Sequence, residues 1–374
     1  MIELSDYATQ ESGFPLLTSS RQGLFVQEDY FTDKQASAET TVFSVLPYGC
    51  ITYRHMSDDN IFHFNINRLV ANGLVSKEYP VFTVRKEVLD TDFLVDTLNS
   101  SPLFSVFCIQ QKKGGTRTRL YFKTLCSYQM FLPVLHEQQV IASFIRLLDK
   151  RIERQMELVE TLKKYKRGLL SREFGQQENG DLNNRYVGKL KDYFHLSSGS
   201  TPSSTNRAFY SGNIRWVSSG ELKPKYLCET SQHISSEAVS SCNLREYPAN
   251  TLLIAMYGLE AAGVRGTASI LSVPATISQA CMAIQQTGEI DIEYLYYWYI
   301  YNGQWIGIRI AQGTKQQNLS TDTLGNLRIY APSCSKQKKV CKLLSQIDYL
   351  IEKEGQKIDL LSSAKRGLLQ QLFI

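Results

Sequence analysis

The sequence has no apolar run close to the roughly 20 residues that a bilayer-spanning helix needs, so we expect no membrane segment. The first ten residues contain no basic stretch followed by an apolar one, which argues against a signal peptide. The eight cysteines are scattered without a CxxC pair, a pattern that predicts reduced thiols in a cytoplasmic protein. Cys334 and Cys341 lie seven residues apart, but no histidine or carboxylate cluster completes a metal site around them.

Motifs for catalysis are also missing. The chain has no NPPY motif for methylation of base amino groups, no glycine-rich loop for S-adenosylmethionine, and no GxxxxGK[ST], HExxH or GxSxG. One loose nuclease-like spacing exists, Asp96 followed by Gln110, Gln111 and Lys112. It lacks the second carboxylate that a metal-dependent nuclease needs to hold its cation. We therefore expect a chain without catalytic activity and without a cofactor of its own.

Charge is modest and unevenly placed along the chain. The net charge is +5. Residues 132–174 carry nine basic against six acidic side chains and residues 332–374 carry eight against four, whereas residues 1–131 and 175–331 are nearly balanced. The excess on two segments is compatible with a polyanionic partner but does not by itself indicate DNA.

An internal repeat is the most informative feature of the sequence. Residues 131–174 align without gaps with residues 330–373 at an offset of 199, so that Pro133 matches Pro332 and Asp149 matches Asp348. The same offset superposes the pentapeptide Lys-Arg-Gly-Leu-Leu at 166–170 on the copy at 365–369. A gapless match of this length indicates a duplicated segment.

Each copy has the pattern of a long helix with a coiled-coil seam, because apolar residues recur at steps of three, four and seven after the proline. The seam positions are Ile141, Ile145, Leu148, Ile152, Val159, Leu162 and Leu169 in the first copy and Val340, Leu344, Ile347, Ile351, Ile358, Leu361 and Leu368 in the second. Gln155 and Glu354 interrupt the two seams at mid-length. A helix must bury its apolar stripe, so we predict that the two copies pair with each other rather than packing only on their own domains.

The segments between the helices look like diverged copies of one mixed fold. Ser19-Ser20 matches Ser218-Ser219 at the same offset, and the stretch 4–7 resembles the stretch 190–193. Strand-like runs at 14–18, 81–84 and 251–256 alternate with turns, and the aromatic-rich residues 295–301 predict a core helix. We predict an α+β chain, with mixed α/β domains at 1–131 and 175–331. The helices at 132–174 and 332–374 should form an antiparallel coiled coil, in a pseudo-two-fold internal repeat.

This order resembles the specificity subunits of type I restriction-modification enzymes over nearly the whole chain. The resemblance is carried by the doubled helix, by residues 14–24, 199–202 and 213–218, and by residues 313–319 leading into 328–332. It implies a non-catalytic subunit whose two target-recognition domains each read one half of a split double-stranded DNA target. It also implies that the helices set the unread spacer and that two methyltransferase subunits and motor-nuclease subunits are the partners.

Glycine-rich polar loops suit DNA contact, because bare backbone can approach the duplex closely, while Arg can pair with guanine and Gln or Asn with adenine. The first-domain candidates are Lys112, Lys113, Gly114, Gly115, Thr116, Arg117 and Arg119, and the second-domain candidates are Gln312, Gly313, Thr314, Lys315, Gln316, Gln317 and Asn318. Residues matched in the repeat, or lying in another glycine turn, are further candidates: Ser19, Ser20, Arg21, Ser218, Ser219, Gly220, Tyr257 and Gly258.

Two other interpretations stay open at this point. One is a specificity protein that is stand-alone or belongs to a type IIG or IIB system, with the same chemistry and a different partner. The other is a protein-binding coiled-coil scaffold without DNA readout. The near-neutral domains favour the scaffold, but a scaffold does not explain why the duplicated domains have diverged more than their helices.

Overall fold

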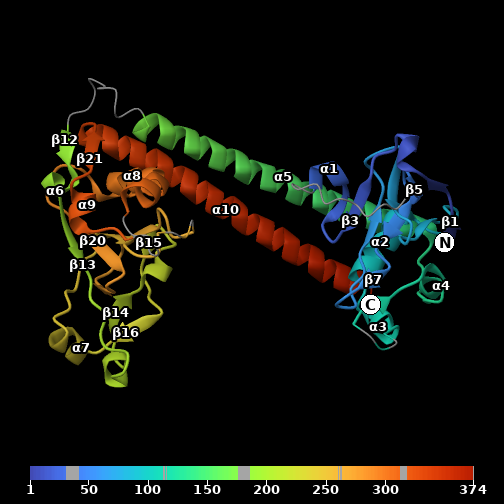
Figure 1. Cartoon of the computed structure of the whole chain (residues 1–374), viewed down its shortest axis with the longest axis horizontal. Helices are drawn as coiled ribbons and strands as arrows, with labels where there is room; N and C mark the ends of the chain where they lie inside the picture. The colour runs from blue at the N-terminus through green and yellow to red at the C-terminus, as the bar shows by residue number, and fades with distance from the viewer. Residues whose placement is uncertain are drawn as a thin grey trace. The chain divides into compact units, whose positions relative to one another are not determined.

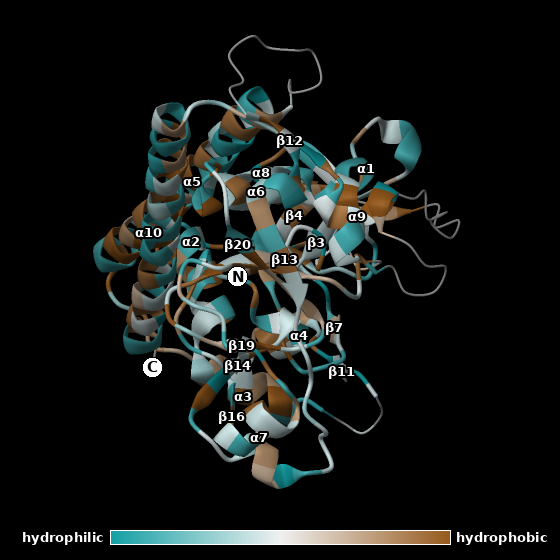
Figure 2. Cartoon of the chain, turned by 90° about the vertical axis from the view of Figure 1, so that its left-hand side faces the viewer, coloured by the Kyte–Doolittle hydropathy of each residue, from teal (hydrophilic) through white to brown (hydrophobic). Residues whose placement is uncertain are grey.

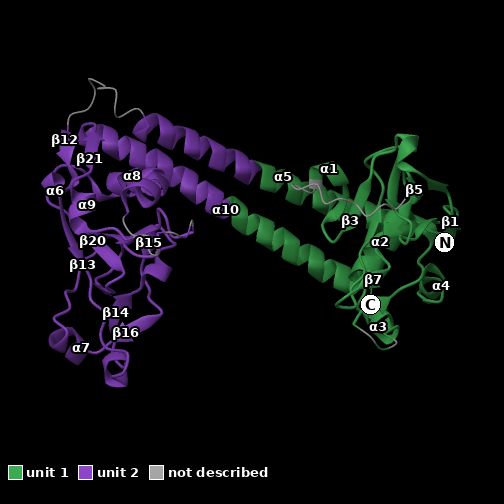
Figure 3. Cartoon of the chain, viewed as in Figure 1, with its two compact units in different colours: residues 1–157, 354–374 green, residues 158–353 purple. Residues whose placement is uncertain are grey.

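The computed structural model (Figure 1) describes residues 1–30, 42–112, 114, 116–175, 186–259, 261, 263–311 and 318–373. The chain forms two compact units (Figure 3): unit 1 contains residues 1–157 and 354–374, and unit 2 contains residues 158–353. Each unit therefore holds one mixed domain and a stretch of both long helices. None of the helices in the described ranges is long and apolar enough to cross a membrane.

The two long helices are α5 (Leu135–Phe174) and α10 (Cys334–Leu372). Each begins two residues after the proline of its copy of the repeat. None of the predicted seam residues is exposed, and along both helices hydrophilic bands alternate with hydrophobic ones (Figure 2). The predicted coiled coil is thus confirmed, because the apolar seam of each helix is shielded from water.

Cross-helix ion pairs establish that α5 and α10 run antiparallel. In unit 1, Lys365 Nζ lies 2.5 Å from Asp149 Oδ1, and in unit 2, Lys166 Nζ lies 2.5 Å from Asp348 Oδ1. The two pairs are counterparts in the repeat, since both the aspartates and the lysines are separated by the offset of 199. Partly exposed pairs of this kind contribute little stability on their own, so their main effect is to define the register of the helices.

Gln155 and Glu354, which interrupt the seams, meet each other in unit 1. Gln155 is buried, and its Nε2 donates a hydrogen bond to Glu354 Oε2. The two residues are each other's counterparts in the repeat. In an antiparallel pair of duplicated helices, only residues at the local two-fold axis can contact their own counterparts. The mid-length gap in the apolar pattern is therefore a polar pair, which favours one register over others.

The domain of unit 1 is built mainly on two small antiparallel sheets and short helices. The first sheet has the order β1 (Ile2–Leu4), β10 (Val81–Thr83), β6 (Ile51–Tyr53), β8 (Phe64–Ile66). The second has the order β2 (Tyr7–Ala8), β5 (Phe43–Pro47), β9 (Asn72–Ser76). The helices are α1 (Gln27–Tyr30), α2 (Thr91–Ser100), α3 (Pro102–Gln110) and α4 (Phe122–Leu125).

The domain of unit 2 is larger, and its described residues form three sheets. The main sheet has the order β13 (Phe194–Ser198), β20 (Cys281–Gln286), β17 (Leu252–Ala255), β18 (Ala268–Leu271), β15 (Tyr226–Leu227). The others are β16 (Gln232–Ile234), β14 (Ile214–Val217), β19 (Thr276–Ile277), and the pair β12 (Tyr186–Lys189), β21 (Arg328–Ala331). The α-helices are α6 (Leu190–Tyr193), α7 (Ser236–Ser241), α8 (Ile292–Trp305) and α9 (Thr321–Gly325).

The two domains share one topology, which confirms the internal repeat beyond the helices. The four strands β1-β10-β6-β8 and the four strands β13-β20-β17-β18 occur in the same order, all antiparallel, and a helix follows β10 as α8 follows β20. One local alignment was wrong. Residues 4–7 run from the end of β1 through two residues without regular structure into β2, whereas residues 190–193 form helix α6. A four-residue likeness does not specify a structure, because tertiary pairing overrides it.

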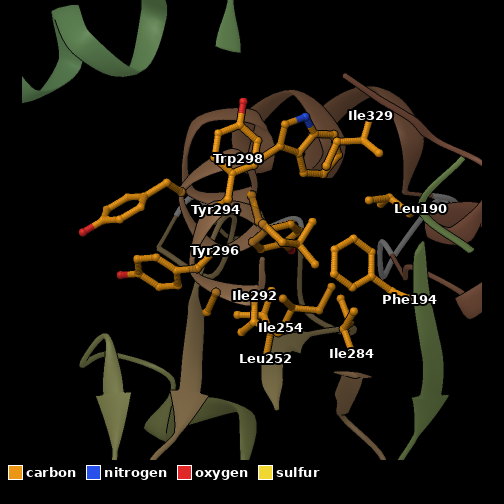
Figure 4. Packing of buried hydrophobic residues seen from close by; sticks show 14 of the residues in the cluster. Leu190, Phe194, Leu252, Ile254, Ile284, Ile292, Tyr294, Tyr296, Trp298 and Ile329 are labelled. Carbon is orange, nitrogen blue, oxygen red and sulfur yellow. The ribbon is translucent and has the colours of Figure 1, made fainter. Parts of the chain in front are cut away.

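The aromatic segment 295–301 is a core helix, as expected. It lies within α8, where nearly every side chain from 292 to 299 is buried. Figure 4 shows Tyr294 and Trp298 of α8 packed over Leu252 and Ile284 of the main sheet. With aromatic side chains burying 150–250 Å² each, this helix supplies a large part of the core of unit 2.

Each domain docks on a long helix through a buried glutamine, and the two glutamines are counterparts in the repeat. Gln138 Nε2 donates to the carbonyls of Val88 and Pro133, and its Oε1 accepts from the backbone N–H of Asp90 at 2.9 Å. Gln337, its counterpart, bonds in the same way to the carbonyls at 289 and 332 and the N–H at 291. Both glutamines are fully buried. Asp90 and Asp291 are the N-caps of α2 and α8, so each glutamine ties a domain helix to a long helix.

We expect Gln138→Leu to destabilise unit 1 by at least about 1–3 kcal/mol, because a buried N–H and two carbonyls lose their partner. The adjacent Gln139 is exposed, and Gln139→Leu is a matched control that should change stability by less than about 0.5 kcal/mol. Urea unfolding followed by circular dichroism measures both. Equal unfolding midpoints for the two variants would contradict the docking role.

Candidate nucleic-acid interface

In unit 1, the predicted residues Ser19, Ser20 and Arg21 lie at the tip of a hairpin formed by β3 (Leu17–Ser20) and β4 (Gly23–Val26). Ser20 Oγ accepts from the N–H of Gln22 and donates to the carbonyl of Gly23, both at 3.1 Å. The buried Asn65 donates to Ser19 Oγ at 2.8 Å and to the Ser20 carbonyl at 2.9 Å. The serines thus build the turn, and Arg21 projects from it with its side chain 62% exposed.

Residues 117–119 of the predicted loop lie beside a second turn. Strand β11 (Thr118–Arg119) pairs with β7 (Met56–Ser57), which places the turn at 58–60 alongside it. Asn60 adopts a left-handed conformation (φ 66°) and accepts a hydrogen bond from Thr118 Oγ1 at 2.5 Å. Two segments nearly sixty residues apart in sequence therefore form one edge.

Ion pairs join the β3–β4 hairpin and the predicted loop to the aspartates of the turn at 58–60. Arg21 Nη2 lies 2.5 Å from Asp59 Oδ2, and Arg117 Nε lies 2.7 Å from Asp58 Oδ1. The hydrogen bonds from Arg21 and from Ser57 Oγ lower the pKa of Asp59 to about 2, so this carboxylate stays ionised near neutral pH. Arg21, Asp58 and the two hairpin serines line a hollow of about 380 Å³.

The same hollow contains residues that the sequence analysis missed. Arg54, which follows β6, and His63, which precedes β8, both line it. Burial, and then the charge of Arg21, lower the pKa of His63, so its imidazole is neutral at physiological pH. Neither residue lies in a glycine-rich loop or matches the repeat, but a polar side chain next to a strand end is a weak signal that could have suggested them.

Other predicted residues of the first domain lie away from this hollow or outside the residues that the structure describes. Arg119 lines a neighbouring hollow with His55 and Tyr121 rather than joining Arg21. Lys112 follows α3, Gly114 has a positive φ of 73°, and Thr116 is exposed. Lys113 and Gly115 lie outside the described residues.

Asp96, the residue of the nuclease-like spacing, belongs to a different environment. It lies on α2, and burial raises its pKa to about 7, against the lowering effect of Lys365 on α10. Its other charged neighbours are carboxylates of α5 and of the same helix region. Burial and these neighbouring charges assign Asp96 to the region of unit 1 where the domain meets the long helices.

In unit 2, the matched serines have a local structural role. Ser218 caps the short helix at Ser219–Glu221, and both its N–H and its Oγ donate to Glu221 Oε2 at 2.8 Å. Ser219 is half-buried, and Gly220 is exposed with open space around its Cα. These contacts explain the fold of this turn and leave its outer edge accessible.

The second glycine turn and the second predicted loop come together. Gly258 has a positive φ of 76° just after β17, and the preceding Tyr257 packs on the core. The N–H of Leu319 donates to the carbonyl of Met256 at 2.9 Å, so the exposed Asn318 lies beside this turn. Gln312, Gly313, Thr314, Lys315, Gln316 and Gln317 lie outside the described residues.

A family model described as the type I restriction modification DNA specificity domain matches residues 72–164 and 184–362. The type I restriction enzyme MjaIX specificity subunit of Methanocaldococcus jannaschii is 29% identical over 192 residues, which cover 50% of this chain and 43% of that protein. The EcoR124I/EcoR124II specificity subunit of Escherichia coli is 26% identical over 219 residues, covering 56% and 52% respectively. The chain thus spans about half the length of the curated relatives it matches.

Solved structures share the fold. The S subunit of a type I restriction-modification system from M. genitalium aligns with a TM-score of 0.57 and 16% identity, covering 99% of this chain and 96% of that one. A chain from a structural study of complex assembly in the type I R-M system aligns with a TM-score of 0.61 and 14% identity, covering 100% and 95%. At such identities the likeness concerns the arrangement of the helices and strands.

Proposed function

The chain belongs to the type I restriction modification DNA specificity family, and on this premise we propose that it is the DNA-reading subunit of a type I restriction-modification complex. Each domain reads one half of a bipartite duplex target. The observation that carries the proposal is the repeat itself: two domains of one topology, diverged in their loops, each tied to a matched helix by the same glutamine. Divergence beside retained helices is what two readers on a common scaffold require.

We also propose that the chain leaves the chemistry to its partners, two methyltransferase subunits and motor-nuclease subunits. A duplicated scaffold offers two equivalent docking positions. On α5, Val140, Phe144 and Leu147 are 46–65% exposed and share one face by their spacing of four and three. Such a stripe outside the seam is a suitable surface for a partner helix.

The Lys-Arg-Gly-Leu-Leu copies serve the chain's own packing. Lys166 and Lys365 form the cross-helix ion pairs, Leu170 is buried in the core of unit 2, and Leu369 packs in unit 1 against the cluster around Phe373. The pentapeptide therefore explains helix register and domain contact. We place partner docking on the exposed apolar residues of the helices instead.

Base-resolution methylome sequencing tests the proposal in a host whose DNA carries no methylation from a related restriction-modification system. Three strains are compared: this chain alone, its cognate methyltransferase subunit alone, and both together. We expect a split methylated sequence only when both are present. Marks produced by this chain alone would contradict its non-catalytic role, and the same marks from the methyltransferase alone would contradict its role in specificity. A complex that forms but leaves no marks would favour the protein scaffold.

A further inference from the structure

Two exposed arginines of unit 1, Arg21 and Arg117, are each held by one carboxylate of the turn at 58–60. Arg21 and Asp58, one residue from each ion pair, line the 380 Å³ hollow. The ion pair of Arg21 uses its Nη2, and that of Arg117 uses its Nε. A guanidinium has five N–H donors in a rigid planar fork, so each pair leaves donors for a ligand. The carboxylate restricts the orientation of the fork, which lowers the entropy lost when a ligand binds.

The charge around these arginines discriminates between two kinds of ligand. A phosphate bound by these arginines would lie close to the carboxylates of Asp58 and Asp59. Because charges of the same sign repel, its binding would be weakened. The major-groove edge of guanine offers two acceptors, O6 and N7, without a net charge. An arginine whose charge is balanced by a neighbouring aspartate therefore suits guanine better than phosphate.

We propose that Arg21 and Arg117 read guanine bases in the half-site of the first domain, with Asp59 and Asp58 as positioning residues that orient them. The inference rests on the proposed function and deepens it, because it names the bases that this surface recognises. It separates these two residues from Arg54, which lines the hollow together with Arg21 and forms no ion pair within the described part of the chain. Arg54 is a phosphate contact and serves as the matched control.

The test uses the full chain assembled with its methyltransferase partner and a duplex carrying the target found by methylome sequencing. Binding is measured by competition against duplexes altered one base pair at a time, and at several salt concentrations. Arg21→Ala and Arg117→Ala should each lose about 5- to 150-fold of discrimination at one guanine and keep the salt slope. Arg54→Ala should weaken all sequences alike and reduce the salt slope by about one.

Two further variants separate orientation from charge. Arg21→Lys keeps the charge but not the fork, so it should lose discrimination at the same guanine as Arg21→Ala. Asp59→Asn removes one of the two repelling carboxylates, so it should raise affinity for unrelated duplexes while reducing discrimination at that guanine. Preference at the half-site of the second domain is an internal control for folding and should not change.

The results that would overturn this inference differ from those that would overturn the proposed function. If Arg21→Ala and Arg117→Ala behave like Arg54→Ala, the two arginines are phosphate contacts and the inference is wrong. A first half-site without a G·C pair would have the same meaning. If the unaltered complex shows no sequence preference, the proposed function itself fails.

Discussion

Replacing residues 1–131 with the matching domain of a relative should change one half of the recognised sequence and leave the other half intact. The two domains have separate cores: the aromatic cluster around Tyr53 and Phe64 in unit 1, and the α8 cluster in unit 2. No side chain is shared between these two clusters. Base contacts that have no common partner contribute nearly independently to specificity.

The junction of this exchange can be chosen from the contacts in unit 1. The donor domain must present an N–H to Gln138 where Asp90 now lies, and an aromatic ring to Phe373 where Phe93 now packs. Residues 132 onward stay, so the seam and its ion pairs are untouched. Without these contacts the donor domain would lose its anchor, and a loss of all marks would report poor folding rather than altered reading.

Methylation-site mapping of the exchanged protein measures the outcome. The reciprocal exchange of residues 186–331 is the control, and it should change the opposite half only. If either exchange altered both halves, or altered neither, the two domains would not be independent readers.

Lengthening both long helices by one turn should lengthen the unread spacer and keep both half-sites. Because the helices are antiparallel, an insertion in α5 must be matched across the pair. The register set by the Lys166–Asp348 pair puts Leu162 opposite Glu352, so four residues are added beside each. Four residues extend a helix by about 6 Å, which corresponds to about two base pairs of DNA.

An insertion beside Leu162 alone is the matched control. It would shift half of the seam past its partner and leave one register set by Lys166–Asp348 and another by Lys365–Asp149. We expect that variant to unfold at lower urea concentration and to leave few or no marks. Methylome sequencing of the variant with the paired insertion measures the spacer length and both half-site sequences. Changed half-site bases at a constant spacing would show that the helices do not set the spacer.

The sequence alone determined the duplication, the paired helices and the two mixed domains. These features follow from two patterns in the sequence. One is the gapless repeat at an offset of 199, and the other is the helical spacing of apolar residues that must be buried together. The core role of residues 295–301 followed in the same way, since an aromatic run of this kind is too apolar to face water. The family resemblance added the function, because the order of elements is specific although no single motif is.

Only the tertiary structure decided which residues meet. Arg21 and Asp59 are separated by 38 residues and Gln138 and Asp90 by 48, and no periodicity relates them. The same holds for Gln155 and Glu354, which look like faults in the seam until the antiparallel register brings the two counterparts together. Arg54 and His63 could not be found because their place in a hollow depends on how the strands pair. Contacts between distant residues follow from the burial of the whole core, which a local pattern does not encode.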